Sequence, residues 1–318
     1  MMRQTVRILL LIALTACTGK AHKQDNNVKK DSITVQTDQD ENIDTLEITR
    51  LFREKLREKI LDYDISNLAI IQKWNYRKNM YIVLMRFSIS NNRVNELTGD
   101  SSELDKNEKL FVGMIDISDG LKLVSISDDV SNQKIDCNHT LISDYQDPTS
   151  DSTIIYYKEM WEDYRSYPEF DFAKYQISNT EYAFGIRFNR HEPFASGAVD
   201  SNVLLLYKNE YNQSKKSYSL NCIFAQPMNL ESCFYSYPGS DEMENEVGRR
   251  AYFEEVNSIV RILPKQTNGY YDLQLQSKAC EGVTKHFSGK EKTSSKTTKK
   301  IINFHWDANT GSYQPPVN

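Results

Sequence analysis

Residues 110–127, LFVGMIDISDGLKLVSIS, decide the fold class of this chain because two apolar runs flank the pair Asp119-Gly120. Asp-Gly between two apolar runs favours a two-residue type I′ turn, in which both residues need positive φ. The stretch therefore predicts a β-hairpin with antiparallel strands.

Segments with the two-residue period of a half-buried strand recur along the chain. Three pairs of such segments share one pattern, an apolar strand followed by a loop and a second strand. The expected pairs are 81–87 with 110–116, 182–188 with 202–211, and 270–276 with 301–307. We therefore expect a mainly β protein of antiparallel hairpin modules, arranged like a β-propeller or as a sandwich.

One amphipathic helix is expected at the start of the folded part, in residues 44–64. Asp44 followed by Glu47 has the spacing of a capping box. Apolar residues then fall on one helical face, which we expect to pack into the core. They are Ile48, Leu51, Phe52, Leu56 and Ile60.

Two further short helices are expected. Tyr157, Trp161 and Tyr164 have the spacing i, i+4, i+7, which places them on one stripe. This stripe is either a core seam or, in an exported protein, a stacking platform for a glycan or peptide. The second helix is expected in residues 240–256, capped by Ser240.

The N-terminus has the features of a secretory signal. Arg3 and Arg7 precede an apolar run at residues 8–14, which is too short to cross a bilayer that requires about 20 apolar residues. Leu14-Thr15-Ala16-Cys17 resembles the lipobox of bacterial lipoproteins. The resemblance implies cleavage between Ala16 and Cys17 and a lipid anchor, including palmitate, on Cys17.

The resemblance also implies a location in the cell envelope. Thr18 is not the aspartate associated with inner-membrane retention, so an outer-membrane lipoprotein facing the periplasm or the surface is expected. Loss of two arginines with residues 1–16 changes the formal net charge from −5 to −7. A net negative charge gives no electrostatic attraction to nucleic acid or to anionic lipid, so no nucleic-acid partner is expected. Attachment to the membrane must then come from the acyl chains on Cys17.

The expected domain organisation follows from composition. Residues 1–16 are the signal peptide, and residues 17–43 are the lipidated cysteine with a polar, flexible tether. Residues 44–316 are expected to form a β-rich globular region, either undivided or divided near residues 135–170. The lysine-rich run at 290–300 is expected to be a solvated loop, with contact to an anionic partner as the alternative.

The C-terminal part resembles the FG-GAP/VCBS-type blades of β-propellers. The residues that carry the resemblance are Asn268, Gly269, Asp272, Leu273, Trp306, Asp307, Gly311 and Tyr313. The calcium-binding blades of that family place aspartates where this chain has Lys265, Gln266 and Thr267, so no calcium site is implied. What the resemblance implies is a hairpin turn at Asn268-Gly269 and aromatic residues that pack a sheet.

Four cysteines remain after Cys17, and an even number in an exported chain suggests disulfides. Three connectivities are possible. Cys222 and Cys233 are close in sequence, so we favour Cys222–Cys233 with Cys137–Cys280.

Motifs of the common enzyme classes are absent from the sequence. It contains no Gly-x-Ser-x-Gly, His-Glu-x-x-His, Walker or Gly-x-Gly-x-x-Gly motif. No metal or cofactor is expected, since the histidines lack ligand spacing.

Two classes of function remain open. The first is a non-catalytic envelope protein that binds or inhibits a protein, peptide or glycan, or has a structural role. The second is an envelope hydrolase with dispersed catalytic residues, which would require His139, His191 or Asp272 to gather in a deep polar pocket.

The lipid anchor can be tested by labelling cells with radioactive palmitate. We expect the wild-type chain to incorporate label and Cys17→Ser to incorporate none, because the serine hydroxyl cannot form the thioether. Cys222→Ser is the control and should label as the wild type does. Label retained on Cys17→Ser would contradict the anchor.

Overall fold

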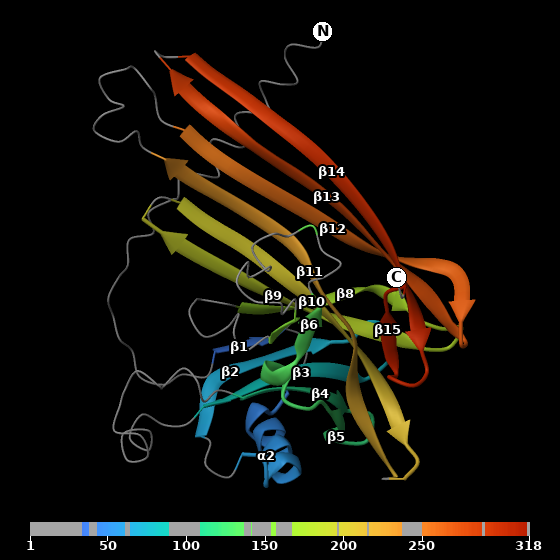
Figure 1. Ribbon diagram of the computed structural model, residues 1–318. Coiled ribbons are helices and arrows are strands. Elements are labelled where there is room, and N and C mark those ends of the chain that lie inside the picture. Colours follow the sequence, from blue (N-terminus) through green and yellow to red (C-terminus); the bar gives the residue numbers. More distant parts are fainter. Residues whose placement is uncertain are drawn as a thin grey trace. The chain divides into compact units, whose positions relative to one another are not determined.

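Figure 1 shows the computed structural model. It describes residues 34–37, 43–60, 64–88, 109–136, 141, 154–156, 167–195, 197–214, 216–236, 250–287 and 290–316, all of which belong to the unit formed by residues 33–318. The helices are α2 (Thr45–Leu56) and the 3₁₀ helix η2 (Val130–Asn132). The strands are β1 (Thr34–Thr37), β2 (Asp64–Lys73), β3 (Met80–Ser88), β4 (Lys109–Asp116), β5 (Lys122–Ile126), β6 (Lys134–Asp136), β7 (Ile154–Tyr156), β8 (Tyr167–Gln176), β9 (Tyr182–Phe194), β10 (Gly197–Asn212), β11 (Ser217–Ser236), β12 (Arg250–Thr267), β13 (Tyr270–Phe287), β14 (Lys290–Asp307) and β15 (Ser312–Gln314).

The protein is mainly β, as the sequence predicts. Strands β1–β5 form a five-stranded sheet in chain order, and β8–β15 form an eight-stranded sheet, also in chain order. Strands β6 and β7 pair with each other. All three predicted strand pairs are confirmed as antiparallel neighbours: β3 with β4, β9 with β10, and β13 with β14.

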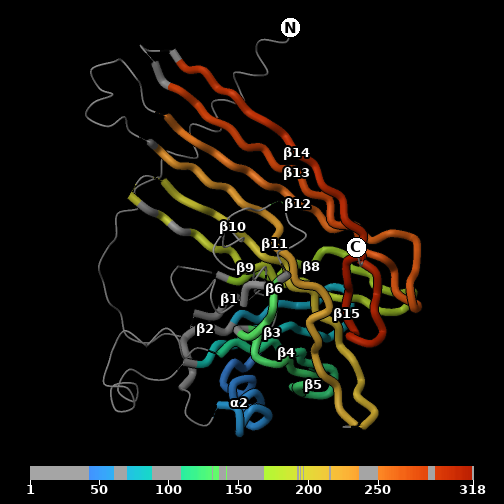
Figure 2. The backbone as a smooth tube through the Cα atoms, viewed as in Figure 1, coloured from blue at the N-terminus to red at the C-terminus, as the bar shows by residue number. Residues whose placement is uncertain are grey.

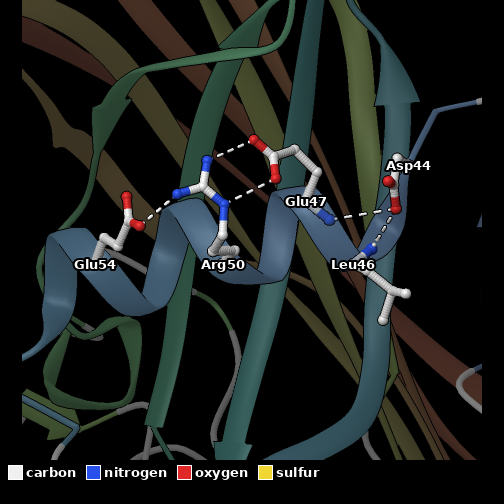
Figure 3. Close-up of polar contacts among 5 residues, drawn as sticks. All are labelled: Asp44, Leu46, Glu47, Arg50 and Glu54. Atoms are coloured by element: carbon white, nitrogen blue, oxygen red, sulfur yellow. Dashed lines mark hydrogen bonds and ion pairs between the residues drawn. The ribbon is translucent and has the colours of Figure 1, made fainter.

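Helix α2 begins where the sequence predicts, because Asp44 caps it (Figure 3). The Asp44 carboxylate accepts hydrogen bonds from the backbone N–H groups of Leu46 and Glu47. Glu47 does not complete the capping box but holds Arg50, which also contacts Glu54. Thus α2 has one capping interaction and a chain of ion pairs along its exposed face.

The buried face of α2 and the five-stranded sheet enclose one core. Ile48, Phe52 and Leu56 of the helix pack with Val83 and Met85 of β3. The alternate residues of β3 face the other way, so both faces of this sheet are covered.

The second core lies between the two large sheets. Ile82 and Leu84 of β3 pack there with Val203, Leu205 and Tyr207 of β10. The two sheets therefore stack face to face, which is the sandwich alternative of the prediction.

A third core lies on the opposite face of β10. Leu204 and Leu206 pack with Leu273 and Phe304, although β13 and β14 belong to the same sheet. The eight-stranded sheet is therefore strongly coiled, and a backbone hydrogen bond of 2.8 Å from Tyr271 N–H to the Ile177 carbonyl links its distant parts. Figure 2 follows the chain through this coil from β8 to β14.

The hairpin turns agree with the sequence at one position and differ at another. Asn268 and Gly269 both have positive φ, 52° and 84°, so the predicted hairpin between β12 and β13 is confirmed. At Asp119-Gly120 the hairpin exists, but among the two only Gly120 has positive φ. The type I′ prediction is wrong there because β4 ends at Asp116 and β5 begins at Lys122, which leaves a connection longer than a two-residue turn.

Three segments differ from their predicted conformation. Residues 250–256, expected in a helix, lie in β12, between β11 and β13. The lysine-rich run 290–300, expected as a loop, is part of β14 and pairs with β13. Thr34–Thr37, within the expected tether, pairs with β2 as β1. In each case the segment is held in a sheet by backbone hydrogen bonds to a neighbouring strand, and the local sequence does not reveal that partner.

Within the described ranges, no helix combines the length and apolar character needed to cross a membrane. Helix α2 has only 12 residues and a charged exposed face.

The packing of α2 on the sheet can be tested at Gly113 of β4. A Cβ added there would lie 2.3 Å from Cζ of Phe52, so Gly113→Ala is expected to destabilise the protein by about 1–3 kcal/mol. Urea unfolding followed by circular dichroism measures this cost. Combining the change with Phe52→Leu removes the clashing ring atoms, so the double variant should lose less than the sum of the single losses. Additive losses would contradict this packing.

Candidate functional site

The eight-stranded sheet continues beyond the core, and its outer part is the candidate site. Leu230 and Val256 are the last buried apolar residues of β11 and β12 in this direction. Further along the same face, Phe234 is 38% exposed and Tyr252 is 42% exposed. Large apolar side chains thus continue past the point where the sheet is covered.

This face carries three rows of side chains that run across the strands. Residues directly opposite each other on antiparallel strands share a face, as do residues two apart on one strand. The aromatic row is Phe234, Tyr252, Val283 and Ser294; the basic row is Arg250, Lys285 and Lys292; the acidic row is Ser232, Glu254, Glu281 and Lys296. We call these three rows together the banded face.

A shallow depression of about 590 Å³ lies on the banded face. Its lining combines residues of the aromatic and acidic rows, and Phe253 and Gly282 also contribute. Gly282 is required because an added Cβ would lie 2.6 Å from Cζ of Phe253 and 2.5 Å from the Ser294 carbonyl oxygen. Gly282 and Phe253 alternate with the residues of the rows, so glycine at this position leaves room for the Phe253 ring on the opposite face.

Ser232 at the edge of this depression is only 2% exposed, yet its hydroxyl has no hydrogen-bond partner among the residues that the structure describes. An unsatisfied buried hydroxyl costs about 1–3 kcal/mol. This hydroxyl lies below the surface of the depression, so it is not itself a contact point for a ligand.

Like charges lie directly opposite each other within two of the rows. Glu254 opposes Glu281, and Arg250 opposes Lys285, which opposes Lys292. Within these rows, Lys296 Nζ lies 3.2 Å from Glu281 Oε1 and forms an ion pair with it. Directly opposed like charges are destabilising unless other contacts offset them.

The opposite face of the sheet carries an acidic row of its own, Asp200, Glu231 and Glu255 on neighbouring strands. Partial burial and the charges of Asp200 and Glu255 raise the pKa of Glu231. The described residues contain no group of three or more acidic, histidine or cysteine side chains placed to hold a metal ion.

Lys208 lies at the centre of an enclosed polar cluster. Its side chain is 5% exposed, donates to the Tyr270 hydroxyl and lies 3.7 Å from carboxylate oxygens of both Glu181 and Glu210. Its Nζ is also 5.2 Å from the ring centroid of Trp306. Burial lowers the pKa of Lys208, but the Tyr270 hydrogen bond and the two carboxylates outweigh it, so its pKa is raised. A lysine held protonated cannot act as a base or nucleophile; it ties β10 to β13 and β14.

Of the three residues expected for a hydrolase, the two that the structure describes have separate partners. His191 contacts Asp200 at 2.6 Å in an exposed pair on β9 and β10. The buried Asp272 contacts His305 instead, with 2.9 Å between Oδ2 and Nδ1 and an alignment unsuited to a hydrogen bond. His139 lies outside the described residues.

Aromatic residues that carry the propeller resemblance pack against one another in the sheet. Trp306 and Tyr313 oppose each other on β14 and β15, and their rings meet edge to face. The Tyr313 hydroxyl donates to the Tyr271 carbonyl at 2.8 Å. The predicted role of these aromatics in packing a sheet is confirmed.

The predicted disulfide between Cys222 and Cys233 is wrong, because both lie on the single strand β11 and neither is in a disulfide. Eleven residues of strand separate them by roughly 36 Å, far beyond a disulfide span. Cys280 is not in a disulfide either, and its predicted partner Cys137 lies outside the described residues. Burial raises the pKa of Cys222 to about 12, so this thiol is unreactive at neutral pH.

The other predicted site residues lie outside the described part of the chain. They are Ala16 and Cys17 of the cleavage and lipidation site, and Tyr157, Trp161 and Tyr164 of the aromatic stripe.

The sequence analysis did not identify the banded face, although its pattern is present. Arg250, Tyr252 and Glu254 alternate along β12, while Glu281, Val283 and Lys285 alternate in the reverse order along β13. Reversed order is what two antiparallel strands need to form rows.

Comparison with known proteins provides no assignment: no family model, curated protein or solved structure matches this chain.

The acidic row on the opposite face gives a prediction for pH dependence. A carboxyl whose pKa is raised by folding costs stability when it is charged, and the cost vanishes once folded and unfolded states are both protonated. Glu231→Gln should therefore raise Tm at pH 7 by about 1–3 °C. The gain should disappear below the ordinary glutamate value of 4.5.

Thermal melts between pH 3.5 and 8 measure this difference. Asp119→Asn, in an exposed turn outside the row, is the control and should leave Tm unchanged. A gain that is the same at every pH would show that charge repulsion is not its cause.

Proposed function

We propose that this protein is a lipid-anchored component of the bacterial cell envelope that binds a protein, peptide or glycan without chemical catalysis. Cys17 would carry the anchor to the outer membrane. The banded face would hold the ligand.

One observation carries this proposal: the exposed Phe234 and Tyr252 border a depression of about 590 Å³ on the banded face. Exposed aromatics bring large burial on binding with little loss of side-chain entropy. They therefore provide the apolar contact area that a binding surface needs.

The geometry favours binding over hydrolysis. A hydrolase requires a nucleophile, a base and a group that orients the base, all within hydrogen-bond reach. His191 and Asp272 have separate partners, and Lys208 is held protonated by its own neighbours. The open, aromatic banded face is suited to a ligand that lies on the surface.

The proposal is tested by affinity capture from an envelope extract with the tagged full-length chain in mild detergent. We expect the double variant Phe234→Ser/Tyr252→Ser to lose at least nine-tenths of the captured ligand, since it removes the apolar contact area. Quantitative mass spectrometry, with parallel glycan detection, measures the loss.

Tyr211→Ser/Tyr218→Ser is the matched control. These tyrosines are 42% and 47% exposed and oppose each other on β10 and β11, outside the banded face. The control should capture as much as the wild type. Equal capture by all three proteins, or equal loss in both variants, would contradict a ligand site on the banded face.

A further inference from the structure

We propose that the banded face also binds a second copy of this chain, related by a two-fold axis that runs along the aromatic row. This goes beyond the proposed function and does not depend on it, because the argument uses only the order of charges on the face.

The banded face is self-complementary. A two-fold axis along the aromatic row reverses the strand direction of the second copy but leaves each strand opposite its own counterpart. The basic row of one copy then faces the acidic row of the other, on both sides of the axis. The aromatic row faces itself.

The pairing can be stated residue by residue. Arg250 would face Glu254 of the second copy, and Lys285 would face its Glu281, each contact occurring twice by symmetry. These contacts place opposite charges beside the like-charge pairs Glu254–Glu281 and Arg250–Lys285 that each copy holds alone.

The charge complementarity does not extend to the edge strand β14. Lys292 would face Lys296, a like-charge contact at the rim. Lys296 already contacts Glu281, and its side chain is 76% exposed, so solvent screens this contact. The attractive pairs lie on β12 and β13, nearer the centre.

The size of the banded face indicates a weak dimer. Four strands spaced about 4.8 Å apart, over five residues of about 3.3 Å each, cover roughly 300–400 Å² per copy. Stable complexes bury about 800 Å² per partner. The association should therefore depend on concentration, and a ligand on the banded face should displace the second copy.

The first experiment uses the position of Tyr252 on the axis, where each copy meets its own counterpart. In full-length protein in the host envelope, Tyr252→Cys should form a covalent dimer with a short bismaleimide, seen on a denaturing gel at twice the chain mass. Tyr218→Cys, equally exposed but outside the banded face, should give at least tenfold less dimer. The wild-type chain provides the background from its own cysteines.

The second experiment uses charge reversal in the Tyr252→Cys background. Glu254→Lys/Glu281→Lys makes both charged rows basic, and Arg250→Glu/Lys285→Glu makes both acidic on β12 and β13. Each variant alone should lose at least nine-tenths of the covalent dimer. Co-expressed with different tags, they should form the mixed dimer at or above the level of Tyr252→Cys alone, because every facing charged pair on β12 and β13 is then attractive.

The outcomes separate the alternatives. A mixed dimer confirms the proposal and also shows that both variants fold. Dimer yields from Tyr252→Cys equal to those from Tyr218→Cys would overturn it, as would a crosslinked product whose mass is not twice that of the chain. Failure of the affinity capture with retention of the covalent dimer would reject the proposed function alone.

Discussion

The fold depends on the burial of both faces of β10. Within Val203–Tyr207, alternate side chains enter two different cores, one against the five-stranded sheet and one against β13 and β14. A register slip of one residue would exchange these two sets of side chains, so the register of β10 is strongly specified. The strands on either side inherit this register through their ladders, including the outer positions that form the banded face.

The strands of the eight-stranded sheet are longer than the core requires. Strand β11 has 20 residues and β12–β14 have 18 each, so the sheet extends past the buried region. The extension buries little apolar surface and places like charges opposite each other, which lowers stability unless other contacts offset it. Its persistence is understandable if the extension serves association, and the lysines of β14 direct that association to the face by discouraging edge pairing.

Sequence alone predicts the features that local interactions determine. Asp44 caps α2, and Asn268-Gly269 forms a hairpin turn, because each requires only its immediate neighbours. Residues 250–256 and 290–300 were beyond such prediction, since their hydrogen bonds go to adjacent strands that the local sequence does not reveal. The banded face is even harder to predict from the sequence, because its rows can be recognised only when the register of four strands is known.

The two faces of the sheet extension differ in the order of their charges along the strands. On the banded face the sign of charge reverses along each of β12 and β13, from Arg250 to Glu254 and from Lys285 to Glu281. On the opposite face, Asp200, Glu231 and Glu255 form one row of a single sign, beside the asparagines 202, 229 and 257. A two-fold axis along that acidic row would bring carboxylates against carboxylates. Self-complementarity is therefore a property of the banded face and not of the acidic row behind it, and it follows from the order of residues along the strands.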